Sequence, residues 1–191
     1  MTTTPPVAEK RPATDTHHGI TRTDDYAWLR ADNWQEVMRD PEALPEDIRA
    51  YLEAENAFTK KTLASTETLQ EKLFEELKGR IKQDDSSVPS PHGPWSYYTS
   101  FITGGEYPRI CREPRTGGKE QILLDGNAMG EGLAYFSLGG ASHSPDHRYV
   151  AYGVDIKGSE YYTLKIRDLE IGSDLDDIIE DTSGGATWAQ D

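Results

Sequence analysis

The chain has 191 residues, with 20 Lys and Arg against 34 Asp and Glu, which gives a formal net charge of −14. This balance argues against nucleic acid as a partner, because binding to phosphates needs a basic face. It is compatible with cationic ligands, whose local concentration an acidic surface raises, and equally with an acidic surface that only keeps the chain in solution.

Cysteine content and apolar segments bear on the compartment. Cys111 is the only cysteine, so neither an intrachain disulfide nor a thiolate metal cage can form, which suits a reducing compartment. Residues 1–10 are rich in Thr and Pro and lack the apolar core of a secretory signal. No stretch approaches the roughly 18 apolar residues of a membrane span. We expect a cytoplasmic protein without a membrane partner; a periplasmic form made from a longer precursor is also compatible with the sequence.

The first part of the chain predicts an arm followed by a helix. Residues 1–23 contain Pro5, Pro6, Pro12 and many Thr, which is typical of an extended arm rather than a regular element. Pro45 fits the first position of a helix, where its missing N–H costs nothing. The apolar residues behind it fall on one helical face: Ile48, Tyr51, Leu52 and Phe58.

A second helix is predicted after the first. Leu69, Leu73 and Leu77 recur every four residues and form one apolar face. Thr68 and Glu71 have the spacing of a capping box at the start, and Gly79 can take the left-handed conformation that ends a helix.

Beyond residues 84–87 the pattern changes to short β segments separated by turns. Residues 95–101 alternate between two faces, and Thr103-Gly104-Gly105 is typical of a hairpin turn. In Ser144-Pro145-Asp146 the proline presets the backbone and the aspartate can accept from nearby N–H groups, which predicts another turn. Further strands are predicted at residues 107–111, 121–124, 134–143, 149–154, 161–169 and 177–181.

Strand spacing indicates the architecture. Four strands in roughly 45 to 50 residues is the size of one β-propeller blade, and Trp95 and Trp188 each stand near the start of a β block. We therefore expect an α+β chain: residues 1–80 form the arm and two helices, and residues 81–191 form about two four-stranded blades of an incomplete propeller.

No hydrolase nucleophile is predicted. A serine hydrolase needs an activated serine, a histidine base and an orienting carboxylate, often with the serine in Gly-x-Ser-x-Gly. The nearest match, residues 140–144, lacks the final glycine and leads into a strand-to-strand turn. Ser142 is therefore not expected to act as a nucleophile.

Histidines and acidic residues predict no metal or cofactor site. His143 and His147 have the spacing of zinc ligands on a helix, but Pro145 lies between them and no glutamate follows His143, which favours turn histidines. His17 and His18 lie in the arm without a readable partner, and no phosphate-binding glycine loop occurs. One acidic group could hold calcium but alternates with apolar residues, which favours a charged outer strand: Asp174, Asp176, Asp177, Glu180 and Asp181. We expect no catalytic, cofactor-binding or metal residue and no cofactor.

Several motifs in order carry a resemblance to a known family. Residues 24–30 (DDYAWLR) and 51–56 (YLEAEN) resemble N-terminal signatures of the prolyl oligopeptidase family of serine peptidases. Residues 71–89 and Glu106-Tyr107-Pro108 are similar to its oligopeptidase B branch. Later segments agree with the same branch over a resemblance that runs from about Pro5 to Asp191: residues 5–8, 10–12, 17–19, 144–153, 158–164 and 167–169.

The resemblance implies a specific fold and activity. Members pair a seven-bladed propeller with an α/β-hydrolase domain, whose Ser-Asp-His triad lies C-terminal to the propeller and on which the N-terminal helices pack. The propeller restricts access to short peptides, and oligopeptidase B cleaves after Arg or Lys, with acidic specificity groups mostly beyond this segment. No catalytic residue of the family can be carried onto any position of this sequence.

The function expected from the sequence is that of an N-terminal fragment of a serine oligopeptidase specific for basic residues and inactive by itself. Its expected partners are a peptide substrate, through a full-length parent, and the missing hydrolase domain. An alternative is a stand-alone binding module derived from the propeller. A generic acidic α+β scaffold without a ligand is a third interpretation, which the density of family motifs disfavours.

Overall fold

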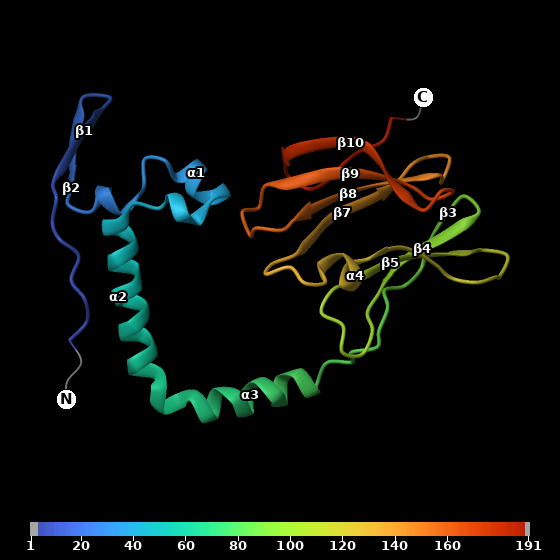
Figure 1. The fold of residues 1–191 in the computed structure, drawn as a ribbon, viewed down its shortest axis with the longest axis horizontal. Helices are drawn as coiled ribbons and strands as arrows, with labels where there is room; N and C mark the ends of the chain where they lie inside the picture. Colours follow the sequence, from blue (N-terminus) through green and yellow to red (C-terminus); the bar gives the residue numbers. More distant parts are fainter. Residues whose placement is uncertain (1–3, 190–191) are drawn as a thin grey trace. The chain divides into compact units, whose positions relative to one another are not determined.

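The computed structural model describes residues 4–189 and divides the chain into two compact units, with the boundary between Arg80 and Ile81 (Figure 1). The first unit holds a β-hairpin and the helices, and the second holds two four-stranded sheets. No helix among the described residues is both long enough and apolar enough to cross a bilayer.

The N-terminal arm contains a β-hairpin, so the prediction of an arm without regular structure was wrong. Strands β1 (Ala13–His17) and β2 (Ile20–Asp24) pair antiparallel, with His17 opposite Ile20. The two residues of the turn, His18 and Gly19, both have positive φ, as a tight hairpin turn with the right twist requires. Both strands are exposed, which explains why the sequence has no apolar alternation that would have predicted them.

Residues before the hairpin are tied to the helical part by Arg11. Its Nη1 donates to Oδ2 of Asp47 at 2.5 Å, and its guanidinium lies 4.1 Å from the centroid of the Trp28 ring. The indole N–H of Trp28 in turn donates to the carbonyl of Glu9 at 2.9 Å. The arm is therefore held on the helical unit by side chains rather than by a sheet.

Both predicted helices are present, together with short helical turns that the sequence pattern did not predict. Helix α2 begins one residue after Pro45, which is the N-cap rather than the first helical residue. The complete set in this unit is η1 (Ala27–Leu29), α1 (Trp34–Arg39), η2 (Pro41–Ala43), α2 (Glu46–Leu63), η3 (Ala64–Thr66) and α3 (Glu67–Gly79).

The predicted ends of α3 were wrong. Thr68 lies inside the helix rather than at its N-cap, which is Thr66, and no side chain caps this end. The capping box is absent because η3 leads from α2 directly into α3, so no extended residue precedes the helix. Gly79 is the last helical residue and is not among the residues with positive φ; Arg80 follows in the right-handed region.

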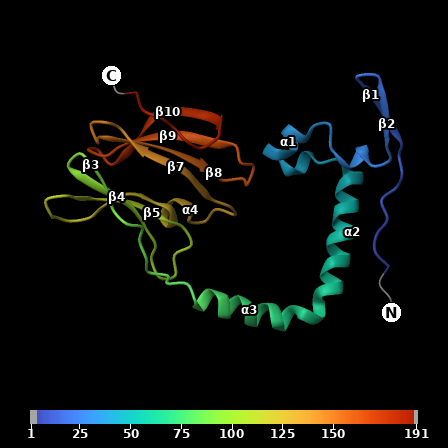
Figure 2. The same cartoon turned by 180° about the vertical axis from the view of Figure 1, so that it is seen from behind.

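The second unit consists of two antiparallel sheets whose strands follow each other in chain order. The first sheet has the order β3-β4-β5-β6 and the second β10-β9-β8-β7. Figure 2 shows both sheets from behind. A short helix, α4 (Gly126–Gly130), follows the first sheet. The strands are β3 (Ser90–His92), β4 (Trp95–Ser100), β5 (Arg109–Pro114), β6 (Gln121–Asp125), β7 (Ser137–His143), β8 (Tyr149–Asp155), β9 (Tyr162–Asp168) and β10 (Ser173–Thr182).

The two sheets share one apolar core. Leu123 and Leu124 from β6 pack with Val150 and Tyr152 from β8, and each of the four is at most 5% exposed. Partly buried side chains from several strands surround them: Tyr97, Ile110, Met129, Leu138, Ala141, Val154 and Leu169. This contact fixes one sheet against the other within the unit.

After β10 the chain crosses the face of the second sheet. A Cβ on Gly153 would lie 2.6 Å from the backbone of Gly184, and one on Gly139 would lie 2.9 Å from the same residue's carbonyl oxygen. Glycines in β7 and β8 therefore make room for the returning backbone. At the end of this segment the Trp188 indole donates to the carbonyl of Ser142 at 3.0 Å. The β block expected from Trp188 onward has no strand within residues 183–189, and residues 190–191 lie outside the described part.

Candidate functional site at the seam between the two sheets

A groove of about 260 Å³ lies where the two sheets meet. One wall comes from β4 and β5, with Tyr97 and Ile110, and the other from β7 and β8, with Ser142, His143 and Val150. The shared core lies beneath it, since Ile110, Val150 and Leu123 belong to both. The groove therefore has an apolar floor and polar side chains along its edge.

Three histidines gather beside this groove. His92 ends β3, His143 ends β7, and His147 lies in the turn before β8. Nδ1 of His92 lies 3.2 Å from Nε2 of His143, and one ring nitrogen from each histidine lies within 4.8 Å of the others. The sequence spacing singled out two of these residues and favoured turn histidines; the structure adds His92 and brings all three together.

Tyr97 holds two of the histidine rings. Its hydroxyl lies 2.8 Å from Nδ1 of His147, and its ring stacks on that of His143 with 3.9 Å between centroids. Nδ1 of His143 lies 3.1 Å from the carbonyl oxygen of Ser144 and can donate to it, which leaves Nε2 as the acceptor that faces His92.

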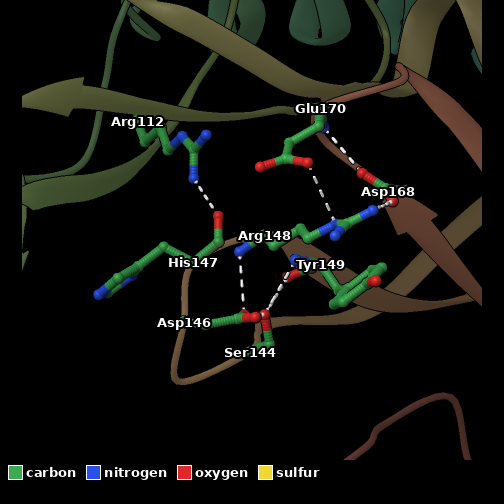
Figure 3. Close-up of polar contacts among 8 residues, drawn as sticks. All are labelled: Arg112, Ser144, Asp146, His147, Arg148, Tyr149, Asp168 and Glu170. Carbon is green, nitrogen blue, oxygen red and sulfur yellow. Dashed lines mark hydrogen bonds and ion pairs between the residues drawn. The ribbon is translucent and has the colours of Figure 1, made fainter.

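The predicted Ser-Pro-Asp turn sets the position of His147 (Figure 3). The Ser144 hydroxyl donates to Oδ1 of Asp146 at 2.5 Å and accepts from the N–H of Tyr149 at 2.9 Å. Oδ1 of Asp146 also accepts from the N–H of Arg148 at 3.1 Å. His147 itself has a φ of 63°, a conformation that bulky side chains rarely adopt. The turn is therefore locked by its own side chains around a strained residue.

Arg112 joins the first sheet to this turn of the second sheet. Its Nη1 donates to the carbonyl of His147 at 2.6 Å, as Figure 3 shows, and its Nε donates to Gln121 at 2.7 Å. The guanidinium also lies 4.0 Å from the centroid of the Trp95 ring. A buried cation with these partners fixes the relative position of β5 and the turn.

An ion pair supports the base of the turn. Both Nε and Nη2 of Arg148 donate to Oδ2 of Asp168, at 3.0 and 2.7 Å, and Asp168 is 2% exposed (Figure 3). The hydrogen bond from Arg148 holds the pKa of Asp168 below its ordinary value. The carboxylate is therefore charged at neutral pH and holds the end of β9 against the turn.

The electrostatics of the seam favour a neutral His147. Burial, followed by the charges of His143, His92 and Arg112, holds the pKa of His147 below its ordinary value. Burial also raises the pKa of Tyr97, so its hydroxyl stays protonated. The site thus places a neutral His147 imidazole and a protonated phenol beside the other two histidine rings, and imidazole nitrogens can bind a ligand through their lone pairs.

The remaining candidate residues have structural partners. The Ser142 hydroxyl donates to the carbonyl of Ala186 at 3.1 Å rather than to a histidine. His17 pairs with Asp15 at 2.5 Å, and His18 forms the hairpin turn.

The acidic group lies on the edge strand β10, as the outer-strand interpretation predicted. Asp174 does more than place a charge on an exposed edge strand. Its carboxylate accepts from Nε of Arg167 at 2.8 Å and from the Tyr152 hydroxyl at 2.6 Å. One of these acidic residues therefore anchors β10 to the core.

Comparison with known proteins identifies the fold. The family model described as "Prolyl oligopeptidase, N-terminal beta-propeller domain" matches residues 5–191. Dipeptidyl aminopeptidase BI of Pseudoxanthomonas mexicana is 35% identical over an alignment of 205 residues that covers 99% of this chain and 27% of that protein. Protease 2 of Moraxella lacunata is 27% identical, over 97% of this chain and 26% of its own length.

Two solved structures are also similar. Oligopeptidase B from Leishmania major has a TM-score of 0.84 and 26% identity, and oligopeptidase B from Trypanosoma brucei has 0.81 and 27%. Each match covers 98% of this chain and 28% of the other. The chain therefore spans about a quarter of the length of the proteins that it resembles.

Proposed function

The chain belongs to the prolyl oligopeptidase family, and on that premise we propose that it supplies the N-terminal helices and first propeller blades of a serine oligopeptidase that cleaves short peptides after Arg or Lys. The observation that carries the proposal is the match to the family's propeller domain across residues 5–191. The branch is suggested by the similarity to two oligopeptidase B structures.

In this proposal each four-stranded sheet is one blade. Antiparallel strands that follow in chain order within a sheet are the arrangement that propellers repeat around their channel. The polar seam then lies between adjacent blades, where Arg112 and the histidines fix one blade against the next. Rigid packing of blades is what a propeller needs to restrict access to a catalytic chamber.

The proposed partner of the helical unit is a hydrolase domain that carries the triad. Leu69, Leu73 and Leu77 are 55%, 46% and 59% exposed on α3, and they recur on one side of the helix. An apolar helical face of this kind normally packs on another element. We propose that the chain alone is inactive, because the nucleophile and its base would come from that domain.

The proposed preference for Arg or Lys rests on the oligopeptidase B resemblance and on charge. A net charge of −14 raises the local concentration of cationic peptides around the protein. A second candidate is an exopeptidase that removes dipeptides from a free amino terminus. It is favoured by the dipeptidyl aminopeptidase of Pseudoxanthomonas mexicana, which shares more identity with this chain than Protease 2 does.

The test assays the 191-residue chain and the product of its complete reading frame side by side. The substrates are an amino-blocked Arg-Arg chromogenic peptide, the same peptide with a free amino group, and a blocked Gly-Pro peptide. We expect the longer product to cleave both Arg-Arg peptides, with inhibition by a serine-directed reagent, and the short chain to cleave none.

Three outcomes would contradict this proposal. Cleavage of the unblocked peptide alone would favour the dipeptidyl aminopeptidase function, and cleavage of the Gly-Pro peptide alone would indicate prolyl specificity. A reading frame without a hydrolase domain would instead favour a stand-alone binding module.

A further inference from the structure

We propose that His92, His143 and His147 form a binding site for a divalent transition metal ion, with Zn²⁺ as the representative ion, at the seam between the two sheets. The site is independent of the proposed peptidase activity. It uses residues from both sheets, so a bound ion would link β3 to the end of β7 and to the turn before β8.

The geometry matches what imidazole ligands need. Two histidine nitrogens bound to one tetrahedral zinc ion at 2.0–2.1 Å lie about 3.3 Å apart. Nδ1 of His92 and Nε2 of His143 are already 3.2 Å apart, and the three nitrogens lie within 4.8 Å of one another. Binding therefore needs the widest separation to contract by up to about 1.5 Å, which rotation of side chains can supply.

Neighbouring groups orient two of the rings. Histidines that bind metals usually place their other nitrogen against a carbonyl, carboxylate or similar group, which fixes the ring and its tautomer. Here the carbonyl of Ser144 lies 3.1 Å from Nδ1 of His143, and the Tyr97 hydroxyl lies 2.8 Å from Nδ1 of His147. Both rings therefore already have a partner of the kind that orients metal-binding histidines.

A glycine also creates the space for the cluster. A Cβ on Gly93 would lie 2.3 Å from Nε2 of His147, so the His147 ring rests directly on the backbone next to His92. Gly93 has a φ of 55°, which places the turn between β3 and β4 in a conformation that glycine favours.

The ligand set selects the class of ion. Imidazole nitrogen suits Zn²⁺, Cu²⁺ and Ni²⁺, whereas Ca²⁺ and Mg²⁺ require oxygen ligands. His92 is exposed, so solvent can supply a fourth ligand to a three-histidine site. Arg112 lies beside His147 and its charge opposes any cation, so only an ion that bonds strongly to nitrogen is expected to bind.

The distribution of histidines provides a matched control. The chain has five histidines, and the other two, His17 and His18, lie in the β1–β2 hairpin of the helical unit. The test titrates the chain with Zn²⁺ by calorimetry and with Co²⁺ by its visible absorption, and compares variants H92Q, H143Q and H147N with the double variant H17Q/H18N. Asparagine is used at positions 147 and 18 because it tolerates their positive φ.

We expect one equivalent of Zn²⁺, a tetrahedral Co²⁺ spectrum and a higher melting temperature with Zn²⁺. H92Q should weaken binding at least about tenfold, whereas H17Q/H18N should bind like the parent chain and Ca²⁺ should not bind. H92Q is the decisive variant, since His92 is exposed and its melting temperature in EDTA should equal that of the parent. Unchanged Zn²⁺ binding in H92Q, loss only in H17Q/H18N, or no binding at about 1 mM Zn²⁺ would overturn the proposal.

Discussion

The helical unit and the β unit bury their apolar side chains to different extents. Among residues 4–80 the buried apolar residues are Ala31 and Ile48, whereas the β unit buries a larger set from both sheets: Cys111, Leu123, Leu124, Phe136, Val150, Ala151 and Tyr152. In α3 no residue is buried. The β unit therefore has a core of its own, while the helices expose the face that would normally hold them.

This difference shows that an amphipathic pattern predicts a helix without saying what covers it. Helices in proteins gain most of their stability from packing of the apolar face against other elements, because nucleation is costly and propensity contributes little. A sheet pair that encloses Leu124 and Tyr152 gains its stability within the unit. Truncating an apolar side chain should therefore change the free energy of unfolding of the two units to different extents.

The largest contrast is expected from truncating leucines in the two units. Leu124 is 0% exposed, so Leu124→Ala should lower the free energy of unfolding of the β unit by about 2–5 kcal/mol through lost burial and a cavity. Leu73→Ala in α3, where the side chain is 46% exposed, should change stability by no more than about 0.5 kcal/mol. Urea denaturation, monitored by amide exchange in each unit, measures the change in the free energy of unfolding for both variants. Equal losses would show that α3 is covered in the isolated chain.

A smaller effect is expected where the backbone crosses the second sheet. Gly153→Ala would place a Cβ 2.6 Å from Gly184, so the crossing segment must shift, at a cost of about 1–3 kcal/mol. Gly185→Ala, in the crossing segment itself, is the control, since a Cβ there meets no atom within 4 Å and the φ of Gly185 is not positive. Urea midpoints of the two variants should therefore differ. If they agree, the segment does not pack on the sheet in solution.

The smallest effect is expected in how the stability of the β unit depends on acidic pH. Burial raises the pKa of Asp174, but the hydrogen bonds from Arg167 and Tyr152 outweigh it and hold that pKa below its ordinary value. The unfolded chain then binds the proton more readily, so this contribution is present above the unfolded pKa of about 3.9 and is lost as the pH falls through the lower folded value.

Urea midpoints of the β unit at pH 7 and about pH 3 test this contribution. D174N should lower stability at pH 7 and reduce the difference between the two pH values. The exposed pair of Arg11 and Asp47 in the helical unit should matter less, because solvent screens it. An unchanged pH dependence in D174N would show that the Asp174 carboxylate does not contribute to acid sensitivity.

Local patterns were sufficient for most elements of the β unit. Alternation over residues 95–101 and the Ser144-Pro145-Asp146 turn predicted β4 and the β7–β8 connection, because period two and turn chemistry are properties of short segments. The β1–β2 hairpin could not be predicted in the same way, because its strands bury no face and so carry no apolar alternation. The prediction of a helix cap at Thr68 was wrong. Its spacing to Glu71 fits a capping box, but the residues before Thr68 are already helical.

Composition, periodicity and short motifs were enough to establish the acidic character, the two long helices, the succession of short strands and the resemblance to the family. Each of these is a property of residues that are close together along the chain. The meeting of His92 with His143, 51 residues away, and the reach of Arg112 to the turn at His147 became visible only in the folded protein. Such contacts depend on the packing of one sheet on the other, which brings together residues whose separation along the chain carries no spacing signal.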